Sequence, residues 1–200
     1  MIFVRRWLEK LFKCGFDAVH FPRCVFNPEM INILFDNDKT IPLKFHTKRA
    51  SLWTTDNTIE NVLKFCLNHL SISDLLDIDF RDTNITEYTN ILLNILIKEG
   101  NKFPRFCLRS SNLMKLYDLI LEYIATSKNC LMIIPDITFL FSTAPNFKLS
   151  ERAEKVEKKQ LTNEKSTKYQ IGNIHNPTMR FSFNNREMYG GSFAYVDIKK

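Results

Sequence analysis

Five short apolar runs recur along this chain, and each is followed by an amphipathic stretch long enough to form a helix. The runs start 26, 33, 28 and 32 residues apart. A strand–helix unit of this size cannot bury its own apolar face, so successive units must stack on one another. The five runs span residues 16–21, 42–46, 75–80, 103–108 and 135–140.

Regular alternation of strand and helix predicts parallel pairing with right-handed crossovers. We therefore expect an α/β fold. Residues 1–146 should form a curved, leucine-rich-repeat-like stack of strand–helix units with a largely parallel sheet. Residues 147–200 should add a small antiparallel β element packed on it. The usual LxxLxLxxN signature is not met, because Asn84 falls out of register, and the spacing exceeds the usual ~20–29 residues.

The C-terminal segment allows two local interpretations. Residues 156–171 have the alternation of a hairpin with a polar loop, which we favour for the latter half of residues 150–171. A competing interpretation takes Ser150 as the N-cap of a helix, supported by acid–base pairs four residues apart. Residues 179–183 and 193–198 alternate cleanly on either side of Gly190-Gly191, which predicts a closing antiparallel pair.

Signals for helix ends are present in the first half of the chain. Residues 3–14 gather Phe3 and Trp7 on one helical face, which we expect to pack on the next element. A presequence or a lipid-binding helix is the alternative for this segment. Asn27 and Pro28 predict an N-cap and first helical position, and Gly100 predicts a helix end.

The composition is that of an ordinary folded domain with a basic excess. Hydrophobic residues make up 44% of the chain and charged residues 25%, and there are 17 Phe. The net charge is +6, with a pI near 9.0. A basic nucleic-acid-binding protein is therefore an alternative function, but the basic residues are dispersed and usually stand beside acids, so nucleic acid is an unlikely partner.

The five cysteines form no CxxC and no close pairs. Three of them, Cys66, Cys107 and Cys130, lie in or beside apolar runs, as buried free thiols do. This pattern predicts a reducing compartment. Charges interrupt the first residues too early for a secretory signal, and no apolar window approaches the ~18 residues of a membrane span. We expect a cytoplasmic or nuclear protein that binds no membrane.

The sequence offers no catalytic motif. Its four His stand apart, so no metal site is expected, and no Gly-rich phosphate loop occurs, so no cofactor is expected. A GxSxG motif is also missing. The apolar residues around Cys66 and Cys107 are expected to raise the pKa of both thiols, which disfavours nucleophilic catalysis by either cysteine. A small enzyme using Asp77, Asp79 and a nearby His is the weakest hypothesis, since such carboxylates usually solvate a strand.

A binding surface is the stronger expectation. Polar residues on the strand faces that helices do not cover would lie side by side, as on the concave surface of a solenoid. The alternative is that they only solvate an exposed sheet. The candidate residues of this partner-binding surface are His20, Lys44, His46, Asp77, Asp79, Arg105 and Arg109.

Several segments resemble the region downstream of the F-box in a large, divergent group of nematode F-box-type proteins. The similarity covers nearly the whole chain and consists of short structural segments, not of catalytic motifs. The segments that carry it are residues 27–31, 63–72, 100–109, 147–154, 168–171, 175–177 and 179–183.

This resemblance implies a non-enzymatic protein-interaction module, similar to the substrate-binding region of a ubiquitin-ligase adaptor. In that family the F-box recruits the Skp1–cullin ligase, and the repeat region holds the protein to be modified. The F-box itself is absent from this chain, so Skp1–cullin is an expected partner only if an F-box lies upstream. The resemblance provides no catalytic residues, and the protein partner is unknown.

Overall fold

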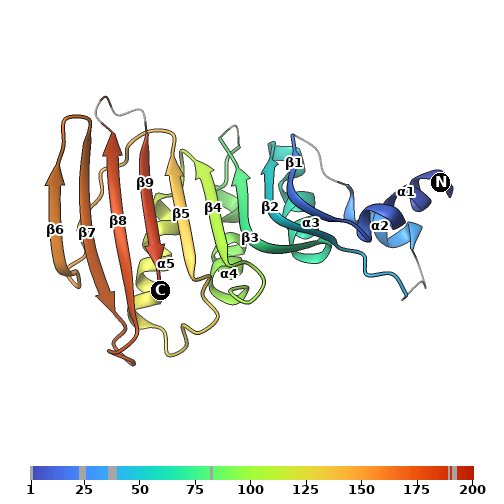
Figure 1. Ribbon diagram of the computed structural model, residues 1–200. Helices are drawn as coiled ribbons and strands as arrows, with labels where there is room; N and C mark the ends of the chain where they lie inside the picture. Colours follow the sequence, from blue (N-terminus) through green and yellow to red (C-terminus); the bar gives the residue numbers. More distant parts are fainter. Residues whose placement is uncertain (1, 23–25, 36–39, 82, 189, 191–192) are drawn as a thin grey trace.

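The computed structural model describes residues 2–22, 26–35, 40–81, 83–188, 190 and 193–200. They form a mixed sheet of nine strands in the order β1-β2-β3-β4-β5-β9-β8-β7-β6 (Figure 1). Strands β1 to β5 are parallel to one another, and β6 to β9 pair antiparallel. The strands are β1 (Gly15–Phe21), β2 (Phe45–Trp53), β3 (Leu70–Asp79), β4 (Arg105–Ser110), β5 (Asp136–Phe141), β6 (Glu154–Gln160), β7 (Glu164–Gly172), β8 (Arg180–Met188) and β9 (Ala194–Lys199).

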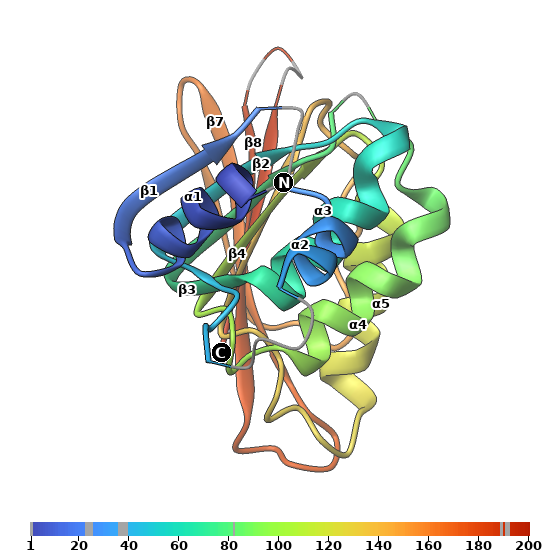
Figure 2. The same ribbon diagram turned by 90° about the vertical axis from the view of Figure 1, so that its right-hand side faces the viewer.

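Helices α2 to α5 lie on one side of this sheet (Figure 2), whereas α1 lies beyond the edge that β1 forms (Figure 1). Strands that pair in chain order with crossovers of one hand place every connecting helix on the same face. The opposite face is therefore left without helices, and we call it the open face. The helices are α1 (Ile2–Phe12), α2 (Pro28–Leu34), α3 (Ile59–His69), α4 (Thr89–Lys98) and α5 (Met114–Thr126), with two 3-10 turns, η1 (Asp56–Thr58) and η2 (Thr86–Tyr88).

One continuous apolar core fills the space between the sheet and the helices. Side chains alternate along a strand, so every second residue faces the core. Registered neighbours form rows across the whole sheet: Leu76 of β3 is level with Phe106 of β4, which is level with Ile137 of β5. The next row contains Ile78, Leu108, Phe139 and Val196, all fully buried.

The predicted strand–helix alternation is confirmed, but the predicted curved solenoid is wrong. A solenoid curves because each strand is backed by its own wider helix, and here that pattern ends after β5. Strand β9 then pairs antiparallel with β5, and the sheet continues through β8, β7 and β6 without helices of their own. The sheet twists instead of closing into an arc, so β1 is inclined to β7 and β8 (Figure 2).

The hairpin prediction for the C-terminal segment is confirmed. Strands β6 and β7 pair antiparallel, and the competing helix from Ser150 is wrong. The closing antiparallel pair is present as β8 and β9. Both predicted parts contribute to one sheet, and residue 146, the expected boundary between them, lies in the connection from β5 to β6.

Local predictions are confirmed at several element ends. The side chain of Asn27 accepts a hydrogen bond from the Glu29 backbone N–H at 2.9 Å, and Pro28 begins α2. Gly100 follows α4, where a Cβ would lie 2.5 Å from the Ile133 carbonyl oxygen. The region 41–53 contains one strand, which begins at Phe45 and has a bulge between Thr47 and Arg49.

The three predicted buried thiols, Cys66, Cys107 and Cys130, are buried and free, while Cys14 is exposed. Cys24 and Gly191 lie outside the described residues. Among the described helices, none is long and apolar enough to span a membrane.

Candidate functional site

The open face is the candidate site, because it exposes a broad polar surface on a rigid sheet. Its side chains form three registered rows that cross strands from both halves of the sheet. The middle row contains His20, Ser51, Asp77, Cys107, Thr138, Asp197, Asn184 and Lys168. The flanking rows contain Arg49, Leu75, Arg105, Asp136, Lys199, Ser182 and Gln170 on one side, and Trp53, Asp79, Arg109, Leu140, Tyr195, Arg186 and Ser166 on the other.

A cluster of ion pairs occupies the centre of this face. The Arg109 guanidinium of β4 lies 3.4 Å from an Asp77 carboxylate oxygen and 3.9 Å from an Asp79 oxygen. Arg81 donates from Nη2 to Asp79 at 2.8 Å and also lies over the Trp53 ring, 5.9 Å from its centroid. One arginine thus holds two carboxylates of the neighbouring strand in place.

Other charges on this face are also compensated. Arg105 donates to Asp74 at 3.0 Å, and Lys199 lies 3.2 Å from Asp136. Arg186 donates to Asp197 at 2.9 Å, and this carboxylate also accepts the Thr138 hydroxyl at 3.0 Å. The result is a mosaic of both signs, with little net attraction for a polyanion.

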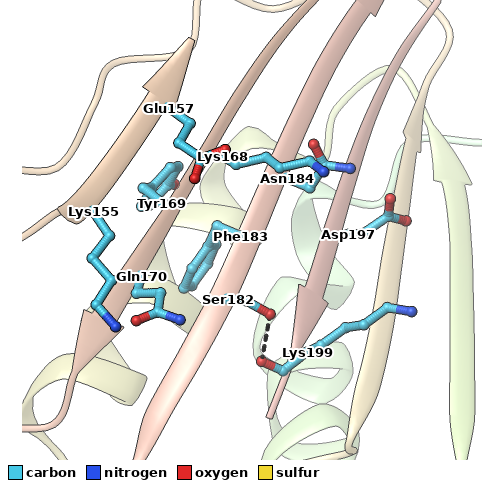
Figure 3. A pocket seen from close by; sticks show the side chains of 10 residues that line it. All are labelled: Lys155, Glu157, Lys168, Tyr169, Gln170, Ser182, Phe183, Asn184, Asp197 and Lys199. Atoms are coloured by element: carbon cyan, nitrogen blue, oxygen red, sulfur yellow. Dashed lines mark hydrogen bonds between the residues drawn. The ribbon is translucent and has the colours of Figure 1, made fainter. Parts of the chain in front are cut away.

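A hollow of about 420 Å³ lies on the open face over β6 to β9 (Figure 3). Lys168, Asn184 and Asp197 come from adjacent strands of one row, and Ser182 donates to the Lys199 carbonyl at 3.3 Å. The residues around it are Lys155, Glu157, Lys168, Tyr169, Gln170, Ser182, Phe183, Asn184, Asp197 and Lys199. Eight of these ten residues are charged or polar, which suits contact with a partner surface better than enclosure of a small apolar ligand.

Several polar atoms of the open face are covered by neighbouring side chains and have no hydrogen-bond partner among the described residues. They belong to both halves of the sheet. A buried polar atom left unpaired costs about 1–3 kcal/mol, so side-chain rearrangement against a bound partner would relieve this cost. The atoms are Asp77 Oδ1, Arg109 Nε, Gln170 Oε1, Asn184 Oδ1 and Arg186 Nε.

The cysteine on this face is a poor nucleophile. Cys107 lies between Asp77 and Thr138 in the middle row. Burial, followed by the nearby Asp77 carboxylate, raises the pKa of its thiol far above the ordinary value. Burial raises the pKa of Cys66 in the same way. A thiol that stays protonated does not attack an electrophile.

Within the described residues, no group of three or more His, Cys, Asp or Glu is placed to hold a metal ion. Arg81 holds Asp79, and Arg109 lies 3.4 Å from Asp77 Oδ2, so positively charged side chains already stand where a cation bound to these acids would lie. The arrangement therefore supports recognition more than acid–base chemistry.

The structure brings together five of the seven predicted surface residues. His20, Asp77, Asp79, Arg105 and Arg109 lie in the three rows of the open face. Lys44 and His46 lie apart from these rows, and binding itself stays a prediction for all seven.

Lys44 and His46 are exposed at the beginning of β2. His46 precedes Ser51 of the middle row by five residues, about 16 Å along a strand at ~3.3 Å per residue. Lys44 lies further out, before the strand begins. The bulge between Thr47 and Arg49 also shifts the alternation of β2. Residue spacing in the sequence alone therefore did not predict correctly which side chains lie beside Lys44 and His46.

Sequence reasoning missed the contribution of the C-terminal strands. Lys168, Asn184, Arg186 and Asp197 belong to the same face as Asp77. Their period-two alternation with buried residues was a usable local signal. This alternation does not indicate that β9 pairs with β5. That pairing joins Thr138 to Asp197, which are 59 residues apart in the sequence.

Comparisons with known proteins give little functional information. Residues 1–81 match a family model described as a domain of unknown function, DUF8381. That model names no F-box family, so the resemblance to F-box-type proteins stays a prediction. A comparison with curated proteins gave no match.

Among solved structures, one match is the crystal structure of an S-adenosylmethionine-dependent methyltransferase from Clostridium acetobutylicum ATCC 824. The two chains are 12% identical, and the alignment covers 99% of this chain and 70% of that chain. The TM-score of 0.19 is too low to indicate a shared fold, and the match carries no argument about function.

Proposed function

We propose that this chain is a non-enzymatic protein-interaction module that binds a protein partner on the open face of its sheet. The observation that carries the proposal is the charge mosaic of that face, in which ion-paired side chains of both signs cross both halves of the sheet. Mixed, preorganised charge gives specificity toward a complementary protein surface.

The same observation disfavours a nucleic-acid partner on this face. Phosphate binding requires arginines and lysines that are free to replace counterions. The guanidinium groups of Arg105, Arg109 and Arg186 are instead bound to carboxylates of neighbouring strands. A partner protein has both acidic and basic side chains, so it can replace these ion pairs with pairs of its own. A polyanion that bound the arginines would leave their carboxylate partners unpaired and would be repelled by them.

The resemblance to F-box-type adaptors supports a more specific version of the proposal. The open face would hold a protein destined for ubiquitination, and a separate F-box would recruit Skp1–cullin. This version adds one test: co-expression with Skp1, with and without any upstream F-box sequence. Association that appears only with the F-box would support an adaptor.

The main test compares two charge-matched double variants in affinity capture from an extract of the organism that encodes the chain. Lys168→Glu with Lys199→Glu alters the open face. Lys98→Glu with Lys115→Glu makes the same charge change on exposed positions of α4 and α5. We expect the open-face variant to lose the specific partners, and the helix-side variant to retain them.

Fluorescence anisotropy with single-stranded 20-mer DNA and RNA tests the alternative, a nucleic-acid partner on the open face. Binding that falls steeply with salt, and that the open-face variant abolishes, would favour nucleic acid and contradict the proposal. Equal loss of protein partners in both double variants would also contradict it, because net charge and not the open face would then explain the capture.

A further inference from the structure

Helix α1 carries an apolar stripe that the core does not cover. Phe3 is 87% exposed and Trp7 is 52% exposed, and Leu11 follows at the same helical spacing. The other face of α1 packs in the core through Leu8 and Phe12, which are buried. Phe12 contacts Phe45 edge-to-face, with ring centroids 4.9 Å apart. The helix is therefore anchored, and its free stripe is held in a fixed position.

An apolar groove of about 410 Å³ lies between this stripe and strand β1. Trp7 contacts Phe26 with ring centroids 5.8 Å apart, and Phe26 stacks on Phe45 at 5.5 Å. Aromatic rings thus form a rigid floor that needs no rearrangement to accept an apolar side chain. The lining residues are Trp7, Leu11, Phe16, Val19, His20, Phe21, Phe26 and Phe45.

Strand β1 is the edge of the sheet at this groove. It pairs with β2 on one side, and within the described residues no strand pairs with its other side. Alternate backbone N–H and C=O groups of β1 are therefore directed outward, as on any edge strand. Figure 1 shows α1 beyond this edge. A further strand, ~4.8 Å out from β1, would cover the groove and the α1 stripe.

The opposite edge of the sheet shows how this chain protects a strand from such pairing. Strand β6 reads Glu-Lys-Val-Glu-Lys-Lys-Gln and is exposed throughout. Charged side chains, lysines above all, discourage strand addition. In β1 the one charged residue is Asp17, which pairs with Lys48 of β2 at 2.7 Å. The edge at β1 has the features of a site for strand addition, with backbone groups for affinity and a pocket for side-chain specificity.

The charges around the groove distinguish between occupants. Both acidic side chains of α1 and β1 are already paired, Glu9 with Arg5 at 3.0 Å and Asp17 with Lys48. In the part of the chain that the structure describes, Arg6, Lys10 and Lys13 form no ion pair. A second copy joined edge to edge would bring these like charges together, whereas an acidic segment would neutralise them.

We propose that β1 accepts an extended, acidic segment of a partner protein as a tenth strand, with an apolar side chain of that segment in the groove beside Trp7. His20 lines the groove and also begins the middle row of the open face, but none of the other lining residues belongs to the three rows. The proposal is therefore tested independently of the function proposed above.

The test begins with random 12-residue peptides displayed on phage and selected against the whole chain. We expect enrichment of sequences that alternate apolar residues with others and carry Asp or Glu. Fluorescence polarisation of the most enriched peptide then measures affinity. Trp7→Ala should weaken binding about tenfold or more, since Trp is a frequent hot-spot residue. Phe193→Ala, 50% exposed at β9, is the matched control and should change nothing.

The charge component is tested with Lys10→Glu plus Lys13→Glu, which should weaken the same peptide severalfold at low salt. Lys98→Glu plus Lys115→Glu is the charge-matched control. Hydrogen exchange should show new protection of β1 amides in the complex. The open-face variant Lys168→Glu plus Lys199→Glu should bind normally, which separates this proposal from the function proposed above.

Three outcomes would overturn the proposal. One is no enrichment, or enriched peptides whose binding Trp7→Ala does not affect. Another is protection of amides outside β1. The third is a concentration-dependent dimer in light scattering that Trp7→Ala abolishes, because a second copy would then be the occupant.

Discussion

The parallel and antiparallel halves of the sheet bury their apolar faces by different means. Strands β1 to β5 alternate with helices that cover them, so this half builds its core from neighbours in the chain. Strands β6 to β9 have no helix of their own, yet Tyr169, Ile171, Phe181 and Phe183 are fully buried. They share the core of the first half, where α5 contacts β7.

Polar contacts specify how the second half docks on α5. The Tyr117 hydroxyl of α5 forms a hydrogen bond with Tyr169 of β7 and accepts one from Asn185 of β8 at 3.4 Å. Burial raises the pKa of both tyrosine hydroxyls, so they remain neutral at physiological pH.

Asn173, just after β7, donates to the carbonyls of Ile124 and Ser127 at 2.7 and 2.8 Å. These carbonyls belong to the C-terminal end of α5 and the residues after it, where helices leave acceptors unpaired. Apolar burial thus makes the two halves adhere, whereas buried amides and hydroxyls fix their register.

The largest expected effect comes from a residue shared by both halves. Phe139 of β5 is fully buried between Leu108 and Val196 in one row. Phe139→Ala should lower the free energy of unfolding by about 3–5 kcal/mol, through lost burial and a cavity. Tryptophan fluorescence reports only on Trp7 and Trp53, which both lie in the parallel half. The urea unfolding transition followed by this fluorescence should coincide with the transition followed by circular dichroism, which reports on the whole chain.

Leu161→Ala, in the exposed β6–β7 turn, is the control and should leave stability unchanged. Two separate transitions in the Phe139 variant would show that the halves fold independently and do not depend on one shared core.

A smaller effect is expected at the docking contact. Asn173→Ala removes the two hydrogen bonds donated to the α5 carbonyls and the two accepted from the backbone N–H groups of His175 and Asn176. It leaves the α5 carbonyls without these donors, so it should cost about 2 kcal/mol. Thermal or urea unfolding measures the loss. Asn176→Ala, a nearby exposed asparagine, should cost far less. Equal losses would mean that Asn173 contributes only through the local turn.

The smallest effect is expected on the open face. Arg105→Gln breaks the pair with Asp74, whose side chains are 47% and 40% exposed. Exposed ion pairs contribute about 0–1 kcal/mol, so the free energy of unfolding should change by no more than that amount. Added salt should not make the change larger. A loss comparable to that of Asn173→Ala would show that the charge mosaic holds the sheet together and is not reserved for binding.

Local physics explains what could be predicted. The Asn27–Pro28 helix start, the helix end at Gly100 and the alternation of 75–80 and 193–198 each depend on a few adjacent residues, and each is present in the structure. The candidate surface was only partly predictable. Asp77, Asp79, Arg105 and Arg109 share a face because neighbouring strands pair in chain order, whereas His46 lies at the beginning of β2, level with Ser71 and away from the three rows.

The sequence by itself determined the strands, the helices and which side chains of most strands are buried, because these follow from propensity and periodicity over short stretches. Only the tertiary structure decided that β9 lies between β5 and β8, that the sheet is therefore a nine-stranded twisted slab without the curve of a solenoid, and that β1 is left as an open edge. Pairing of distant strands depends on the fit of whole surfaces, and no local pattern encodes that fit.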